Sequence, residues 1–222
     1  MTEYDNDAIV YPYITKWLRD NTSTDERLTE LEEYAGEHGV PIAKPETASF
    51  LSVITSIVKP DRILEIGTAI GYSASVMALA YEKTEILSLE YDSEIIPVAQ
   101  ENIERLGLSG RVRIAEADAN DYLSYLDEDG VFDMIFLDGP KAHYVNMLDD
   151  CVRLLRVGGV LVADNVLYKG MTADEEHIIK RKATIVSRLK SYIDALTAHK
   201  ELKTSLLPLG DGITLSVKLG DK

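Results

Sequence analysis

The stretch ILEIGTAIGYS, residues 63–73, decides the fold of this chain. It joins a short apolar run to a turn with two glycines, Gly67 and Gly71, and a helical pattern starts directly after the turn. Glycine lets the backbone pass close to a ligand, and a helix N-terminus offers free N–H groups to an anion. The dinucleotide-binding pattern needs a further glycine where this turn has Thr68 and Ala69, which argues against a pyrophosphate site. A smaller, carboxylate-bearing ligand fits the turn better.

Outward from this stretch, short apolar runs alternate with helical patterns. Runs that are apolar almost throughout are typical of parallel strands buried on both faces. They occupy residues 62–66, 85–90, 111–116, 132–138 and 159–164, with helical spacing at 71–82, 93–107, 120–126 and 141–156. The alternation predicts an α/β fold with a Rossmann-like, doubly wound and mostly parallel sheet.

The two ends of the chain modify this core. Three helical patterns come first, at 9–20, 24–39 with Gly39 as a stop, and 45–59 with Pro45 in the first turn. At the other end we expect a long helix near 173–198 and an antiparallel hairpin of 203–209 and 212–218 around a tight Gly210-Asp211-Gly212 turn. We therefore expect a single domain over 1–222, with a helical N-terminal cap at 1–58 and the Rossmann-like core at 59–222.

The composition limits the partners and the compartment. The formal net charge of −15 disfavours generic nucleic-acid binding. No apolar run approaches the roughly 18 to 20 residues of a membrane span, and the acidic N-terminus does not resemble a signal peptide. The single cysteine, Cys151, reads as a small buried residue, and a reduced cytoplasmic setting follows.

The charge is uneven along the chain. Residues 1–50 carry a net charge of −7, whereas residues 176–190, EHIIKRKATIVSRLK, carry +4. Such a basic run is either a solvated helix face or a surface for a polyanion.

Polar residues end several of the predicted strands. Glu90 ends the second strand and could accept hydrogen bonds from ribose hydroxyls, although a strand-end glutamate often only faces solvent. Asp118 and Ala119 follow the third strand, where a carboxylate could accept from an adenine amino group or simply cap the next helix. The carboxyl ends of parallel strands open into one crevice, which favours the joint ligand-binding interpretation.

Oxygen donors also follow the next two strands. Asp138 ends the fourth strand, and Asp164 and Asn165 end the fifth. Three hard oxygen donors at one edge suit Mg²⁺, Mn²⁺ or Ca²⁺, while turn and cap chemistry is the alternative.

Together these motifs resemble a known family. The set EIGTAIGYSA, SLEYD, ADA, IFLDGPK, VADNVLYKG and PLGDGITLS is similar to the metal-dependent O-methyltransferases, which include catechol and caffeoyl-CoA methyltransferases. The match runs from about Leu28 to the C-terminus. It implies S-adenosylmethionine as cofactor, with residues 40–43 covering it and Lys141 as general base beside metal ligands Asp138, Asp164 and Asn165. The implied cofactor contacts are Ala43, Glu65, Gly67, Gly71, Ser73, Glu90, Asp118, Ala119 and Asp138.

The resemblance also bears on the substrate. Residues 164–170, the basic stretch and the C-terminal hairpin are most similar to a bacterial branch that methylates 5-hydroxyuridine at the tRNA wobble position, although plant-type members tend to carry Trp where Tyr168 stands. DGPK and ADA depart from the commoner DAAK and GDA. A small catechol-type or caffeoyl-CoA-type phenol is the alternative substrate, and a catalytically silent cofactor-binding protein is the non-enzyme alternative.

The expected chemistry does not distinguish the two substrate classes. Catechols and 5-hydroxyuridine both offer two neighbouring oxygens that could chelate a cation, which would lower the pKa of the hydroxyl. Lys141 could then remove the proton if its own pKa is depressed, or it could be a solvated helix residue. A tRNA anticodon loop, unlike a catechol, needs a basic region. That region is Lys169, Lys180, Arg181, Lys182, Arg188 and Lys190.

The N-terminal helices carry more aromatic residues than a sheet-covering helix needs. Tyr4, Tyr11, Tyr13 and Trp17 suggest either a homodimer interface or packing within the monomer.

Overall fold

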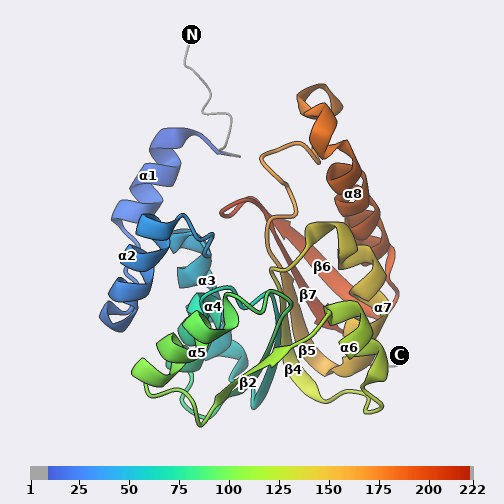
Figure 1. The fold of residues 1–222 in the computed structure, drawn as a ribbon. Coiled ribbons are helices and arrows are strands. Elements are labelled where there is room, and N and C mark those ends of the chain that lie inside the picture. Colours follow the sequence, from blue (N-terminus) through green and yellow to red (C-terminus); the bar gives the residue numbers. More distant parts are fainter. Residues whose placement is uncertain (1–9, 221–222) are drawn as a thin grey trace.

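The computed structural model describes residues 10–220 and contains one seven-stranded sheet in the order β3-β2-β1-β4-β5-β7-β6 (Figure 1). The parallel strands are β1 (Arg62–Ile66), β2 (Glu85–Glu90), β3 (Val112–Glu116), β4 (Phe132–Leu137) and β5 (Leu155–Ala163). The hairpin of β6 (Leu202–Leu207) and β7 (Ile213–Lys218) joins β5 in antiparallel pairing. The predicted Rossmann-like sheet with a C-terminal antiparallel hairpin is confirmed.

Helices cover both faces of the sheet. The N-terminal helices are α1 (Pro12–Asp20), α2 (Thr29–His38), which follows the 3-10 turn η1 (Glu26–Leu28), and α3 (Pro45–Val58). The core helices are α4 (Tyr72–Ala80), α5 (Ile96–Arg105), α6 (Ala119–Tyr125), α7 (Tyr144–Leu154) and α8 (Ala183–Ala198). Gly39 ends α2 in the left-handed conformation with φ 65°, and Pro45 opens α3, both as predicted.

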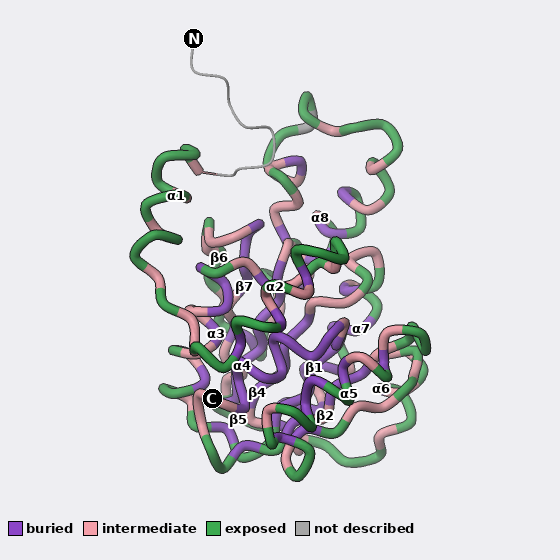
Figure 2. Tube along the Cα trace, turned by 60° about the vertical axis from the view of Figure 1, so that its left-hand side comes forward, coloured by how far each residue is buried: buried purple, intermediate pink, exposed green. Residues whose placement is uncertain are grey.

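The core has two layers, one on each face of the sheet. Leu51 of α3 and Met77 of α4 pack with Ile63 in the first layer. The next residue of the strand, Leu64, packs in the second layer with residues of α7 and α8. Neighbouring residues of β1 thus enter opposite cores, which explains the unbroken apolar runs. Figure 2 shows the buried strands at the centre of the molecule. Cys151 is buried in the second layer, as expected.

One prediction for the last third of the chain is wrong and another is confirmed. The long helix predicted near 173–198 begins only at Ala183, and two short 3-10 turns, η3 (Glu175–His177) and η4 (Lys180–Lys182), precede it. The predicted tight turn at Gly210-Asp211-Gly212 is confirmed: the N–H of Gly212 donates to Leu209 O at 2.8 Å within the loop 208–212 between β6 and β7. The basic stretch is therefore divided between η4 and α8.

Helix α1 lies at the edge of the molecule and has no buried residue. Tyr11, Tyr13 and Trp17 are exposed, and the rings of Tyr11 and Tyr13 stack with centroids 5.5 Å apart. Tyr4 lies outside the described residues. Exposure of these rings disagrees with packing inside the monomer, and the homodimer stays a prediction that light scattering can test. Among residues 10–220, no helix has the length and apolar character needed to span a membrane.

Candidate functional site

A cavity of about 630 Å³ lies at the carboxyl ends of β1, β2, β4 and β5 and beside the segment that follows β3. The doubly wound order places such a crevice where the chain changes direction between β1 and β4. Two predicted site residues, Glu65 and Gly71, do not line it. The others do: Ala43, Gly67, Ser73, Glu90, Asp118, Ala119, Asp138, Lys141, Asp164 and Asn165.

The glycine turn packs tightly against the next strand of the sheet. Gly67 has φ 99°, and a Cβ at this position would lie 2.7 Å from the carbonyl oxygen of Asp138. Any side chain there would push the turn away from β4. Gly71, with φ 80°, precedes α4 and shapes the start of the helix rather than the cavity wall.

Glu65 lies beneath the turn and is fully buried. Its two carboxylate oxygens accept hydrogen bonds from the hydroxyls of Ser73 and Ser88, each at 2.5 Å. Burial raises the pKa of Glu65 to about 7, although these hydrogen bonds oppose the shift. Glu65 therefore ties β1, β2 and α4 together under the cavity.

Glu90 is held by backbone groups on two sides. One carboxylate oxygen accepts from the N–H groups of Thr68 and Ala69 at 3.1 and 2.9 Å, and the other from Tyr91 and Asp92 at 2.8 and 3.0 Å. It is thus not merely a solvent-facing residue at the end of a strand.

Asp118 combines the two roles considered for it. Its side chain caps α6 by accepting from the N–H groups of Asn120 and Asp121, at 2.8 and 3.3 Å. The same residue lines the cavity beside Ala119.

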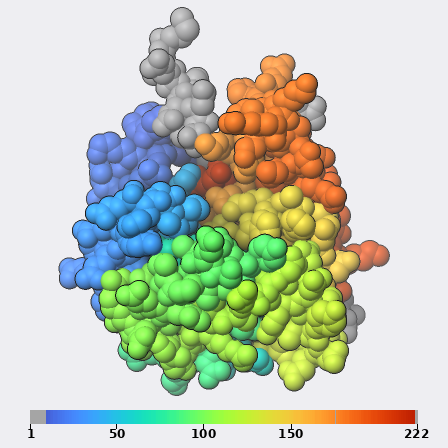
Figure 3. All heavy atoms as spheres, viewed as in Figure 1, coloured from blue at the N-terminus to red at the C-terminus, as the bar shows by residue number. Residues whose placement is uncertain are grey.

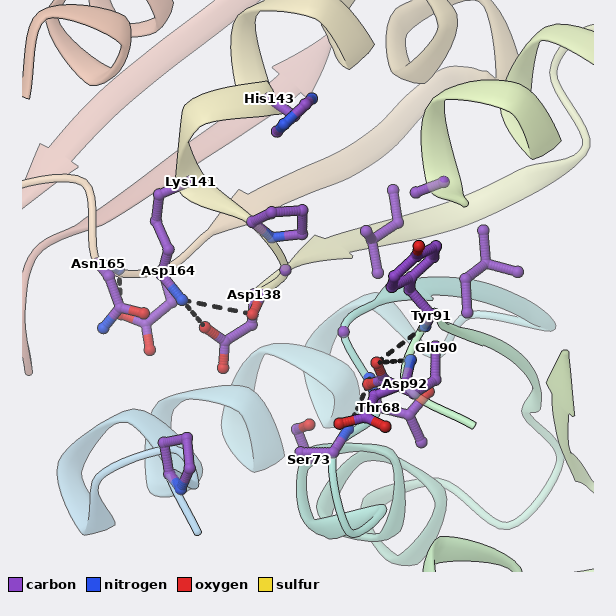
Figure 4. Close-up of a pocket in the computed structure, with 18 of the residues that line it drawn as sticks. Thr68, Ser73, Glu90, Tyr91, Asp92, Asp138, Lys141, His143, Asp164 and Asn165 are labelled. Atoms are coloured by element: carbon purple, nitrogen blue, oxygen red, sulfur yellow. Dashed lines mark hydrogen bonds and ion pairs between the residues drawn. The ribbon is translucent and has the colours of Figure 1, made fainter. Parts of the chain in front are cut away.

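The other end of the cavity gathers the predicted metal ligands. In Figure 4, Asp138, Asp164, Asn165 and Lys141 lie together, apart from the group around Glu90. Lys141 begins the turn η2 (Lys141–His143), and its Nζ donates to Asp138 Oδ1 at 3.0 Å. A quarter of its side chain is exposed, so it is not a fully solvated helix residue.

The two aspartates are acidic groups in an unfavourable setting. Burial raises the pKa of Asp138, and the positive charge of Lys141 opposes that shift. Burial, and then the negative charge of Asp138, raise the pKa of Asp164 to about 7. The backbone of Asn165 is left-handed with φ 59°, and its N–H donates to Asp164 Oδ1 at 2.6 Å. Such a pair of repelling carboxylates fits a cation between them.

Within residues 10–220 there is no group of three or more His, Cys, Asp or Glu side chains arranged to hold a metal ion. A metal site here consequently needs the amide oxygen of Asn165 as its third protein donor. Oxygen donors of this mixed kind suit Mg²⁺, Ca²⁺ or Mn²⁺.

Backbone hydrogen bonds join the two ends of the cavity. The N–H of Gly67 donates to Leu89 O, that of Asp138 to Ile66 O, and that of Asp164 to Leu137 O, each at 2.9 Å. The buried Tyr144 hydroxyl adds a hydrogen bond to Leu137 O at 3.0 Å. The site residues therefore sit on a continuous edge of the sheet.

Several residues at the site escaped the sequence analysis. Lys44, Tyr91, Asn120 and His143 line the cavity. Asp211 lies in the predicted turn, and it is also buried and accepts the backbone N–H of Lys169 at 2.6 Å. An aspartate between two glycines was the one available signal for this role.

Comparisons with known proteins find relatives that match most of this chain. The model of the O-methyltransferase family matches residues 20–219. The catechol O-methyltransferase of Niastella koreensis is 38% identical over 156 residues, which cover 68% of this chain and 71% of that protein. The caffeoyl-CoA O-methyltransferase of Citrus natsudaidai is 29% identical over 203 residues, covering 87% and 88%.

A solved structure extends the similarity to three dimensions. The SAH-bound methyltransferase PaMTH1 of Podospora anserina superimposes with a TM-score of 0.82 at 26% identity, covering 94% of each chain. From the matched family, the chain belongs to the O-methyltransferases.

Proposed function

We propose that the protein transfers a methyl group from S-adenosylmethionine to one hydroxyl of a small phenol with two neighbouring oxygens, assisted by a divalent cation. The observation that carries the proposal is one cavity that has Gly67, Glu90 and Asp118 at one end and Lys141 among the oxygen donors Asp138, Asp164 and Asn165 at the other. The names of the relatives support the substrate class, since they act on catechol and caffeoyl-CoA.

The residues present fit the cofactor. The turn at Gly67 leaves no room for a side chain, and the carboxylates of Glu90 and Asp118 line the cavity where a ribose and an adenine could be bound. The bound SAH in the Podospora methyltransferase, which shares the fold, supports this assignment.

The donor set fits a divalent cation. Asp138, Asp164 and the amide of Asn165 would hold it, because a cation between the carboxylates of Asp138 and Asp164 would relieve the repulsion that Lys141 only partly offsets. When bound, the cation lowers the pKa of a substrate hydroxyl, and S-adenosylmethionine supplies an electrophilic methyl group.

The chain's own residues would then orient the acceptor and move its proton. Asp138 holds Lys141 Nζ at 3.0 Å, which directs the amine into the cavity between the two ends. Lys141 would accept the hydroxyl proton at Nζ after its ammonium group has lost a proton, and the resulting oxygen anion of the acceptor is the nucleophile of an in-line displacement. The loop before α3, with Ala43 buried against the cavity, shields this step from water.

The sequence favoured tRNA over a small phenol, and that order is now reversed. The relatives support the phenol, and the basic stretch does not form the single helix that was expected. Lys182 remains close to the segment after Asn165, with its Nζ 5.8 Å from the Tyr168 ring centroid. A tRNA substrate is therefore one outcome of the test.

The test is one assay with labelled S-adenosylmethionine and two parallel acceptors, catechol and tRNA that contains 5-hydroxyuridine. Methylated catechol should form with Mg²⁺, disappear in chelator and return with Mg²⁺ or Mn²⁺. Methylation of tRNA alone would overturn the substrate class, and full activity in chelator would overturn the role of the cation. Calorimetry that shows no binding of S-adenosylmethionine or SAH would overturn the enzyme assignment, while binding without any turnover would indicate the silent cofactor-binding protein.

A further inference from the structure

A second cavity, of about 490 Å³, opens beside the end of the first that contains the predicted metal ligands, which we call the metal end. Its walls come from α1, the start of α3, the segment after β5 and the 208–212 loop. Figure 3 shows these parts meeting on one face, with the N-terminal helices in blue, the segment near 170–190 in orange and the C-terminal hairpin in red between them. The lining residues are Pro12, Thr15, Lys16, Arg19, Asp20, Lys44, Glu46, Lys169, Gly210 and Asp211.

The two cavities are continuous in residues and in electrostatics. Lys44 lines both of them. Lys44 and Lys141 both interact electrostatically with Asp211, which lines the second cavity. A substrate whose hydroxyls lie near Lys141 can therefore extend its other end toward Lys44.

Two of the basic side chains that line the second cavity form ion pairs with carboxylates. Lys16 bonds Asp20 at 2.5 Å, and Arg19 bonds the buried carboxylate of Glu46 at 3.0 and 3.2 Å. Asp211 accepts the N–H of Lys169 at 2.6 Å.

Lys44 has no such partner. Among residues 10–220, its ammonium group forms no hydrogen bond or ion pair, although it interacts electrostatically with Glu46 and Asp211. A half-buried cation without a hydrogen-bonded partner, at the junction of two cavities, is suited to an anionic group of a ligand.

The net charge of the residues that line the second cavity indicates which kind of anion it can bind. Four basic and three acidic residues line the second cavity, a net charge of +1 in a chain of −15. A carboxylate carries one negative charge and is balanced by this surplus. A phosphate monoester carries about 1.5 to 2 charges at neutral pH and is not.

We propose that Lys44 and the second cavity bind the carboxylate of the phenolic acceptor, so that the preferred substrates are dihydroxyphenyl acids. The inference rests on the proposed function and adds to it a subsite that determines specificity. Lys44 is the residue that recognises the acid, and the walls formed by α1 and the 208–212 loop give room for the linker.

The experiment compares two acids, 3,4-dihydroxybenzoate and 3,4-dihydroxycinnamate, each with its methyl ester. The measured quantity is the ratio of kcat/KM for the acid to that for the ester. In wild-type protein the acids should be preferred, and Lys44→Gln should lower the ratio about tenfold for at least one pair, through KM of the acid, because one charge-assisted hydrogen bond is lost. Lys44→Arg should restore part of the preference.

Lys83→Gln is the matched control, since Lys83 is an exposed lysine in the turn before β2 and should leave the ratio at its wild-type value. Calorimetric titration of each acid and ester into protein with SAH and Mg²⁺ gives a second readout, in which Lys44→Gln weakens only the acid. Equal losses on acid and ester, or ratios that do not respond to Lys44→Gln for either pair, would overturn the subsite while the methyltransferase assignment stands. Failure of all four phenols and of catechol as acceptors would instead overturn the proposed function.

Discussion

At the β2 end of the cavity one carboxylate, that of Glu90, accepts four backbone N–H groups. At the β4 and β5 end two carboxylates, Asp138 and Asp164, have one ammonium group and one backbone N–H between them within the described part of the chain. Both ends lie on the same edge of the same sheet, yet only at the first do hydrogen-bond donors of the protein satisfy both oxygens of the carboxylate.

The contrast shows how the charge is stabilised at each end. Backbone donors that are fixed by the fold stabilise Glu90 at the predicted cofactor end before any ligand arrives. At the other end, the predicted metal end, the carboxylates of Asp138 and Asp164 repel each other, and a bound cation would relieve that repulsion. The following predictions test that difference, from the largest expected effect to the smallest.

Asp164→Asn should break the metal end alone. Turnover of catechol should fall by on the order of 10³-fold or more, because a charged donor for the cation is lost, while the Kd for SAH changes less than about threefold. Initial rates and calorimetry measure the two quantities. Asp149→Asn, on an exposed position of α7, is the control. A similar loss of SAH affinity in Asp164→Asn would mean that the two ends are not separable.

Glu65→Gln should change how stability depends on pH. The pKa of Glu65 is raised to about 7 in the folded protein, so the folded state binds the proton more tightly than the unfolded state. The stability that this group contributes is present below its unfolded pKa, near 4.5, and is lost as the pH rises through 7; the loss is about 3 kcal/mol.

Urea unfolding at pH 5 and pH 8 measures the effect. The free energy of unfolding of Glu65→Gln minus that of wild type should be more positive at pH 8 than at pH 5. Saturating Mg²⁺ is present in both measurements so that Asp164 contributes little to the pH dependence. The same pH dependence in both proteins would contradict the assigned pKa.

Glu90→Gln should weaken the cofactor end without disturbing the metal end. The Kd for SAH should rise by about tenfold to a hundredfold, because hydrogen bonds to a charged acceptor are replaced by neutral ones. The binding of Mn²⁺, followed by its electron paramagnetic resonance signal, should stay within about twofold of wild type. Loss of Mn²⁺ binding in this variant would show that Glu90 supports both ends.

The strands could be predicted from the sequence because each is buried on both faces. The runs at 62–66 and 85–90 coincide with β1 and β2. Strand β5 starts earlier than predicted, at Leu155, because this residue pairs with Phe132, a contact across the sheet that local apolar spacing does not reveal.

The segment after β5 could not be predicted, because distant contacts determine it. Tyr168 and Lys169 have left-handed backbones, with φ 44° and 58°. The backbone N–H of Leu167 donates to Asp211 O at 3.0 Å, so the 208–212 loop holds this segment in place. Further on, Ile179 is half exposed and belongs to neither core cluster, so the apolar spacing that suggested a helix at this point has no core to pack against.

The site was predicted where single residues end strands and was missed where two loops meet. Glu90, Asp138 and Asp164 could be located because parallel strands end at one edge. Lys44 and Asp211 come from a loop before α3 and a loop after β6, and only the folded chain brings them to the same cavity.

The row of backbone hydrogen bonds that joins Leu89, Gly67, Asp138 and Asp164 also sets a length. Neighbouring strands lie about 4.8 Å apart, so the three intervals from β2 to β5 amount to about 14 Å. Side-chain replacement cannot alter that span, since it belongs to the backbone. Mutations that change the acceptor must therefore act on the surrounding loops, and the separation between Glu90 and the Asp138–Asp164 pair should be the same whatever molecule is methylated.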